Sequence, residues 1–376
     1  MLLTNAHLVL EDEVFHGTLQ VENGIVREMS EGQTQLPGAI DCEGDYLLPG
    51  LVELHTDNMD KHFGPRPGVD WPADPAFHSH DAQMVAAGIT TVFDAVAIGD
   101  VVEESVRMRN LQRMVSAVND YRSSARAEHF LHLRCELSHG ETLDRFQRLV
   151  DTPNVQLVSL MDHSPGQRQF VRLDKYREYY QGKYGMSDQQ LEEFVARQKS
   201  GSERYSDQFR QAICQICHDR DIAIASHDDA TAGHVREAVA LNMVIAEFPT
   251  TEEAAARSHQ SGMGVLMGAP NVVRGGSHSG NIAAHLLASR EQLDILSSDY
   301  IPSSLLWSAF ILADREDNSL DLAGSVKLIT ANPARAAGLD DRGRLAPGLR
   351  ADLVRVRRDT ETPRVVTVWR EGERVF

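Results

Sequence analysis

Short apolar runs separated by helix-length segments fill the middle of the chain. They read, in order, LVELHTD, TTVFDAV, HLRCEL, VQLVSLMDH, IAIASHD, VIAEFP, GVLMGAP and DILSSD. A strand buried on both faces reads as a continuous apolar run, and two parallel strands need a crossover of about a dozen or more residues between them. The pattern therefore predicts the α/β fold class, with eight βα units that close into a TIM-like (β/α)8 barrel over residues 51–339.

Both ends of the chain alternate apolar and polar residues with a period of two, which is typical of strands with one buried face. The first end carries Asn-Gly at residues 23–24 and the last carries Glu-Gly at residues 371–372, and both dipeptides favour hairpin turns. Because the pattern changes at both edges of the barrel segment, we expect residues 1–50 and 340–376 to join as one small β-sandwich domain.

One predicted connection, near residues 165–205, is much longer than the roughly 2–6 residues usual in βα units. It is rich in Arg, Lys, Gln and Tyr. Two interpretations are open: a mobile lid over an anionic substrate, which we expect, and a solvated helical hairpin, which the stretch SDQQLEEFVARQ favours. The lid would bring Lys183 to the substrate.

Composition narrows the function classes. The chain of 376 residues holds 55 acidic and 37 basic residues, a net charge of −18, which argues against broad nucleic-acid binding. No apolar run approaches the ~20 residues of a membrane span. The start, MLLTNAHLVL, has no basic region or cleavage site, so it predicts a strand and a cytoplasmic protein rather than a secreted one.

The cysteines are too few for a disulfide framework: Cys42, Cys135, Cys214 and Cys217. Cys214 and Cys217 form a CxxC, but they lie in a helix-like run with no second pair to complete a zinc site. We therefore expect buried, reduced thiols.

Polar residues follow the predicted strands where each strand ends, and in a barrel the strand carboxyl ends face the active site. His55 and Asp57 share one face of the first strand, since side chains alternate along a strand. A single His near a strand end is usually a structural residue, but this set is hard to explain by packing alone. We expect it to bind zinc, with Mn, Fe or Ni as alternatives; about four of these ligands would serve one ion and all six would serve two. The set is His55, Asp57, Glu136, His163, His227 and Asp299.

The order of these motifs resembles the amidohydrolase superfamily over essentially the whole chain. A Pro-Gly and a strand lead to His55-x-Asp57, a late Asp299 follows, and then come NPA at residues 332–334 and GLRADLV at residues 348–354. The resemblance implies metal-assisted hydrolysis at a carbonyl or phosphorus centre. Asp299 would then be the catalytic residue that takes the proton of the attacking water.

Longer segments, including ELHTDNMDKHFGPRPGVDWP, LVSLMDHSPGQRQF and GAPNVVRGGSHSGN, resemble one branch of that superfamily. Its members are diphosphatases of phosphonate catabolism that release pyrophosphate from a ribose phosphonate triphosphate. The chain departs from the commonest superfamily pattern: it has His-x-Asp rather than His-x-His, no Lys at the end of the fourth run, and Glu247 where many relatives have a His. The number of ions, one or two, therefore stays open.

An anionic small-molecule substrate needs fixed positive groups and backbone amides. The Gly- and Ser-rich loop at residues 274–281, RGGSHSGN, can present N–H groups to phosphate oxygens, although an ordinary glycine turn is the alternative. The candidate substrate-binding residues are Lys61, Arg66, Arg168, Lys183, Arg274 and His278.

Two rival functions share the same residues. The first is hydrolysis of a C–N bond, as in deacetylases and cyclic amidases of the superfamily. The second is a barrel kept only as a scaffold, which predicts missing ligands; here the five residues His55, Asp57, His163, His227 and Asp299 are all present. The sequence does not decide whether the chain forms a homo-oligomer.

Overall fold

The computed structural model describes residues 1–66, 68–100, 105–166, 168, 181–182, 185–277 and 280–376. Lys183, His278 and most of the predicted lid before residue 181 lie outside the described residues. The chain divides into two compact units. The first unit comprises Met1–Asp94, Ala117–Phe130 and Met267–Phe376, and the second comprises Ala95–Ser116 and Leu131–Leu266.

All eight predicted apolar runs form strands of one parallel sheet, in the order β13-β12-β11-β10-β9-β8-β7-β6. The early strands are buried along nearly their whole length, which is why they appear as mainly apolar runs in the sequence. The strands are β6 (Leu51–Thr56), β7 (Ile89–Ile98), β8 (Glu128–Glu136), β9 (Val155–Met161), β10 (Ala223–His227), β11 (Ile245–Glu247), β12 (Gly264–Gly268) and β13 (Ile295–Ser297).

The first and last strands of this sheet, β6 and β13, meet within the first unit. Thr56 and Asp299 form a parallel bridge. The Asp57 N–H donates to the Asp299 carbonyl at 2.9 Å, and the Asp299 N–H donates to the His55 carbonyl at 3.2 Å. These contacts join the two edges of the sheet, so the predicted TIM-like barrel is confirmed.

Several of the described helices begin at a residue whose side chain caps them. Ser187 forms a capping box with Gln190 at the start of α6, and Thr231 and Thr251 cap α7 and α8. The helices are α1 (Asn58–Phe63), α2 (Ala73–Ala86), α3 (Val106–Tyr121), η1 (Arg122–Ser124), α4 (Thr142–Leu149), α6 (Asp188–His218), α7 (Ala232–Ala240), α8 (Glu252–Gln260), α9 (Ala269–Val273), α10 (Ala284–Ser289), α11 (Ser304–Ala313), α12 (Leu322–Lys327) and α13 (Ala331–Ala336).

Helix α6, 31 residues long, takes up the part of the predicted lid segment from residue 188 onward. It is fastened to the residue that follows β9: the hydroxyls of Ser202 and Ser206 donate to the Asp162 carboxylate at 2.7 and 2.8 Å. Cys214 and Cys217 lie on its buried face, and all four cysteines of the chain are buried and free, as predicted. Within the described residues, no helix is long and apolar enough to span a membrane.

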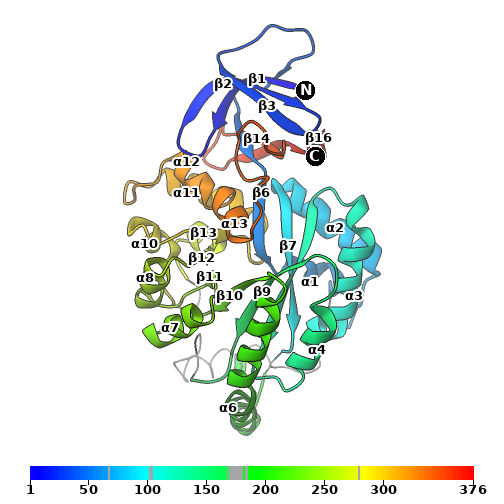
Figure 1. Cartoon of the computed structure of the whole chain (residues 1–376), viewed down its shortest axis with the longest axis vertical. Coiled ribbons are helices and arrows are strands. Elements are labelled where there is room, and N and C mark those ends of the chain that lie inside the picture. The colour runs from blue at the N-terminus through cyan, green and yellow to red at the C-terminus, as the bar shows by residue number, and fades with distance from the viewer. Residues whose placement is uncertain (67, 101–104, 167, 169–180, 183–184, 278–279) are drawn as a thin grey trace. The chain divides into compact units, whose positions relative to one another are not determined.

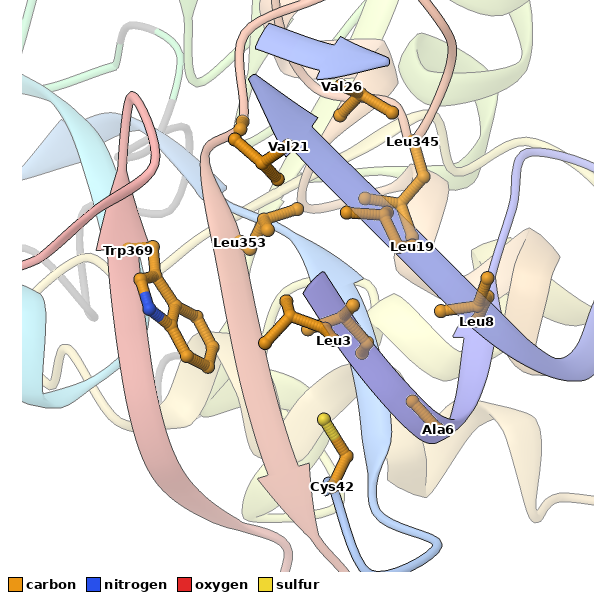
Figure 2. Close-up of a cluster of buried hydrophobic side chains, with 12 residues drawn as sticks. Leu3, Ala6, Leu8, Leu19, Val21, Val26, Cys42, Leu345, Leu353 and Trp369 are labelled. Carbon is orange, nitrogen blue, oxygen red and sulfur yellow. The ribbon is translucent and has the colours of Figure 1, made fainter. Parts of the chain in front are cut away.

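The two chain termini build a second sheet inside the first unit, as predicted (Figure 1). Its order is β16-β15-β14-β5-β1-β2-β3, with β4 paired to β1. Leu3, Leu8 and Leu19 from one end pack with Leu353 and Trp369 from the other (Figure 2). The strands are β1 (Leu2–Val9), β2 (Val14–Glu22), β3 (Ile25–Glu31), β4 (Ile40–Asp41), β5 (Tyr46–Pro49), β14 (Leu353–Arg357), β15 (Arg364–Arg370) and β16 (Glu373–Arg374).

Both predicted hairpin turns are present in this sheet, and they touch each other. Asn23 and Gly24 have φ angles of 51° and 77°, the left-handed values that a tight hairpin turn needs. A Cβ on Gly24 would lie 2.9 Å from the carbonyl oxygen of Glu371 in the other turn. Glycine is therefore required at residue 24 both for its backbone angle and for space.

Candidate metal centre

In the first unit, three of the predicted ligands lie at the ends of β6 and β13. His55 is 1% exposed near the end of β6, and Asp57 follows as the residue before α1. Asp299, which follows β13, has φ of 55°, a left-handed value that costs a non-glycine residue of order 1–3 kcal/mol. Since the backbones of His55 and Asp57 bond to that of Asp299, the structure brings these three residues together.

Glu53, which sequence reasoning missed, fixes this arrangement. It lies two residues before His55, on the same face of β6, and is fully buried. Its two carboxyl oxygens accept the N–H groups of His55 and Ser298, each at 2.6 Å, and thereby link β6 to β13. Burial raises the pKa of Glu53 to about 8, against the opposing effect of these donors. An acidic residue inside an apolar run, in step with His55, was the signal available in the sequence.

In the second unit, two histidines and one carboxylate face a common point. The Asp228 Oδ2 atom lies 3.5 Å from His163 Nε2 and 3.5 Å from His227 Nε2. That oxygen is buried and makes no hydrogen bond within the described part of the chain. Two imidazole nitrogens and one carboxylate oxygen are a donor set that suits Zn²⁺ and related divalent ions. The residues present therefore fit a metal ion.

The other ring nitrogens of these histidines are held by glutamates. His163 Nδ1 bonds to Glu136 Oε2 at 2.6 Å, and His227 Nδ1 bonds to Glu247 Oε2 at 3.0 Å. A carboxylate on Nδ1 fixes the tautomer and directs Nε2 toward a metal. Burial lowers the pKa of His163, but the negative charges of Glu136 and Asp228 outweigh burial and raise it to about 10. A metal ion bound to His163 would replace the ring proton that this raised pKa describes.

A second buried cluster of the first unit supports the start of α1. The Asp94 carboxylate bonds to His80 Nε2 and to His129 Nδ1, both at 2.7 Å, and His129 Nε2 lies 3.3 Å from Asp81. The Asn58 amide, next to Asp57 in the chain, donates to His80 Nδ1 at 3.1 Å. Because nitrogen and oxygen lie at direct hydrogen-bond distance, the cluster is a hydrogen-bonded network that holds α1 in place.

Comparison with known proteins identifies the family. A family model described as "Amidohydrolase family" matches residues 76–376. The chain belongs to the amidohydrolase family. It is 56% identical, over 378 residues, to the alpha-D-ribose 1-methylphosphonate 5-triphosphate diphosphatase of Escherichia coli (strain K12), and the match covers 100% of both chains. The superfamily resemblance stated from the motifs is confirmed.

Solved amidohydrolase-like structures share the fold at low identity. A 5-methylcytosine deaminase from Klebsiella pneumoniae matches with a TM-score of 0.67 and 16% identity, over 100% of this chain and 98% of that one. An N-acetyl-D-glucosamine-6-phosphate deacetylase from Mycobacterium smegmatis matches with a TM-score of 0.65 and 20% identity, over 100% of both chains. At these identities the likeness shows the fold alone.

The predicted substrate-binding residues of this amidohydrolase fall into different settings. Lys61, Arg66 and Arg274 are exposed, and the Lys61 ammonium donates to the Tyr300 carbonyl. Lys183 and His278 lie outside the described residues.

Arg168 has a setting that the sequence did not predict. Its side chain is 5% exposed, forms ion pairs with Asp229 and, at 3.0 Å, with Glu237, and donates to the His227 carbonyl at 3.3 Å. Its charge is thus balanced inside the protein, next to the backbone of a candidate ligand.

Proposed function

We propose that the protein is a metal-dependent hydrolase that cleaves alpha-D-ribose 1-methylphosphonate 5-triphosphate with one water. The products are pyrophosphate and alpha-D-ribose 1-methylphosphonate 5-phosphate. The observation that carries this proposal is the 56% identity, over the whole of both chains, to a diphosphatase of that name. The donor set of His163, His227 and Asp228, of which the last two are buried, supports the metal dependence.

The proposed ligands are five of the six residues predicted from the strand ends, His55, Asp57, His163, His227 and Asp299, with Asp228 added. Each lies near or just after the carboxyl end of a strand of the parallel sheet. Glu136, the sixth predicted residue, instead orients His163, because its two oxygens accept from the Ser138 hydroxyl and bond to the His163 ring. Glu136 and Glu247 orient His163 and His227 through Nδ1, so the Nε2 atoms are presented to the ion. Zinc suits this set best, with Mn, Fe and Ni as alternatives, and the number of ions is one or two.

The residues of the chain divide the chemistry between them. A bound divalent ion supplies a lowered pKa for water and polarises a phosphoryl oxygen. Asp299 takes the proton of the attacking water, because a carboxylate at a strand end can act as a general base. Glu53 holds Asp299 and His55 in register through the N–H groups of His55 and Ser298. We propose attack at the α-phosphorus, which releases pyrophosphate as the leaving group.

Phosphorus NMR of the products tests this function directly. The holoenzyme should convert the triphosphate to pyrophosphate and the 5-phosphate, at a kcat/KM far above its values for a cyclic amide and an N-acetyl sugar phosphate. A higher kcat/KM for either C–N substrate would favour the rival amidohydrolase function instead. In ¹⁸O-labelled water, label should enter the 5-phosphate, and label in pyrophosphate would contradict attack at the α-phosphorus.

The four free, buried cysteines support a reducing compartment, and we propose the cytoplasm. The proposed partner is the anionic ribose phosphonate triphosphate.

A further inference from the structure

A cavity of about 580 Å³ lies in the second unit, between the β8–α4 connection and α6. Ser138, His139 and Arg145 line one side, and Arg197, Arg204 and Tyr205 of α6 line the other. This volume lies within the range of about 300–1,000 Å³ that is usual for small-molecule sites. No function has been assigned to the cavity so far.

The wall formed by α6 is held in a fixed position. Gly201 lies in the interior of α6, where glycine costs about 1 kcal/mol relative to alanine. A Cβ at this position would lie 2.4 Å from the Ser138 carbonyl oxygen, so only glycine lets the helix approach the connection so closely. The hydroxyl of Ser202, the next residue, donates to the Asp162 carboxylate at 2.7 Å. The cavity is therefore a built feature of the fold.

The cavity is lined by two positive charges that no ion pair among the described residues neutralises. Arg197 and Arg204 are seven residues apart on α6 and so share one face of the helix. Within the described residues neither forms an ion pair, and their guanidinium groups lie over the rings of Phe194 and Tyr205, at 5.6 and 5.2 Å from the ring centroids.

The other charged groups of the lining leave that charge available. Arg145 is paired with Glu141 at 2.6 Å, and Asp100 is the second carboxylate of the wall. Two unpaired guanidinium groups in a chain of net charge −18 are suited to bind an anion.

Hydrogen bonds connect this cavity to the candidate metal ligands. The Ser138 hydroxyl, at the cavity wall, donates to Glu136 Oε1 at 2.7 Å, and Glu136 Oε2 holds His163 Nδ1 at 2.6 Å. An anion in the cavity would thus lie at one end of a hydrogen-bond chain that leads through Ser138 and Glu136 to His163, a candidate ligand. A triphosphate whose first phosphorus reacts at the metal has two further phosphates to place nearby.

We propose that this cavity binds the two terminal phosphates of the substrate, and then the pyrophosphate product, through Arg197 and Arg204. Guanidinium groups match phosphate oxygens bidentately, and hydrogen bonds between charged groups are the stronger kind. The identity of the bound group as part of a triphosphate rests on the proposed function. The presence of a pyrophosphate site in this cavity does not depend on the proposed function.

Titration calorimetry of the holoenzyme with inorganic pyrophosphate tests the site without turnover. Each of Arg197→Gln and Arg204→Gln should weaken binding by about tenfold or more, since a hydrogen bond to a charged group contributes about 1.5–3 kcal/mol. Lys199→Gln is the matched control, because Lys199 is exposed on the same helix, carries the same charge and does not line the cavity. Unchanged pyrophosphate affinity in both arginine variants would overturn the proposal, and so would an equal loss in the Lys199 variant.

Kinetics of the same variants then test the link to the substrate. We expect KM for the triphosphate and the inhibition constant of pyrophosphate to rise together, with inhibition by the 5-phosphate product unchanged. If the enzyme does not cleave the triphosphate, the proposed function is wrong. If the arginine variants then still bind pyrophosphate more weakly than the wild type, the anion site stands. Circular dichroism checks each fold, and Arg204→Gln alone suffices if loss of the Arg197–Phe194 contact destabilises α6.

Discussion

Replacing His129 with glutamine should lower the free energy of unfolding by about 3 kcal/mol at neutral pH. The ring is completely buried and bonds to Asp94 at 2.7 Å and to Asp81 at 3.3 Å. Burial alone would lower the pKa of His129, but these two carboxylates outweigh it and raise the pKa from 6.5 to about 9. At about 1.4 kcal/mol per pKa unit, this shift corresponds to roughly 3 kcal/mol. Breaking a buried ion pair by removing one partner costs a similar amount, about 3–5 kcal/mol.

The sign of the shift sets the pH dependence. The folded pKa of His129 lies above its unfolded value, so the protonated ring stabilises the fold fully below about pH 6.5. This stabilisation is lost as the pH rises through about 9, where the folded protein also gives up the proton. The difference in unfolding free energy between wild type and His129→Gln should therefore be largest near pH 6 and shrink steadily up to pH 10.

Urea denaturation of both proteins at several pH values measures this difference, because other titrating groups are common to both. His78→Gln is a suitable control: His78 also pairs with an aspartate, at 3.2 Å, but on the partly exposed face of α2. Such surface pairs contribute about 0–1 kcal/mol. A difference below about 1 kcal/mol for His129→Gln at pH 7, or one that stays constant between pH 7 and 10, would refute the reasoning.

Three further outcomes are expected. His227→Ala should lose most of its bound metal by elemental analysis while its circular dichroism is unchanged; full metal content would remove His227 from the ligand set. Gly201→Ala should lower stability by about 1–3 kcal/mol, because the new Cβ would meet the Ser138 carbonyl at 2.4 Å, whereas Ser200→Ala on the same helix should not. Burial raises the pKa of the Cys214 thiol to about 11 and of the Cys217 thiol to about 12. These thiols should therefore resist alkylation at pH 8 in the native protein and react in urea. Rapid alkylation of the native protein would contradict this.

The fold could be predicted from the sequence because its signals are local. The barrel strands are buried along most of their length and so appear as mainly apolar runs, and the hairpins at residues 23–24 and 371–372 rest on two adjacent turn residues. We predicted that the two termini pair in one sheet because both segments alternate apolar and polar residues with a period of two. These features depend on neighbours in the chain, which a sequence displays directly.

The candidate site was predictable only where strand geometry dictates it. His163 and His227 were found because they end predicted strands. Asp228 was missed as a ligand, because a strand's alternation turns the residue after His227 to the other face. Its φ of 56° breaks that alternation and brings its carboxylate to the two histidines. The sequence does not show that backbone angle, so this candidate ligand was identified only in the structure.

Whether a basic side chain can bind the substrate depends on which carboxylates lie next to it in the folded protein, and the sequence does not show those neighbours. Arg168 stood in a basic loop and was predicted to bind substrate, yet Asp229 and Glu237 already balance its charge. Arg197 lies in the stretch that favoured a solvated hairpin, and both it and Arg204 are exposed, but Gly201 brings α6 against Ser138, so both arginines line the cavity. A guanidinium group has more donors and charge to offer a phosphate where no carboxylate is already paired with it. That condition favours the α6 arginines over Arg168 as substrate ligands.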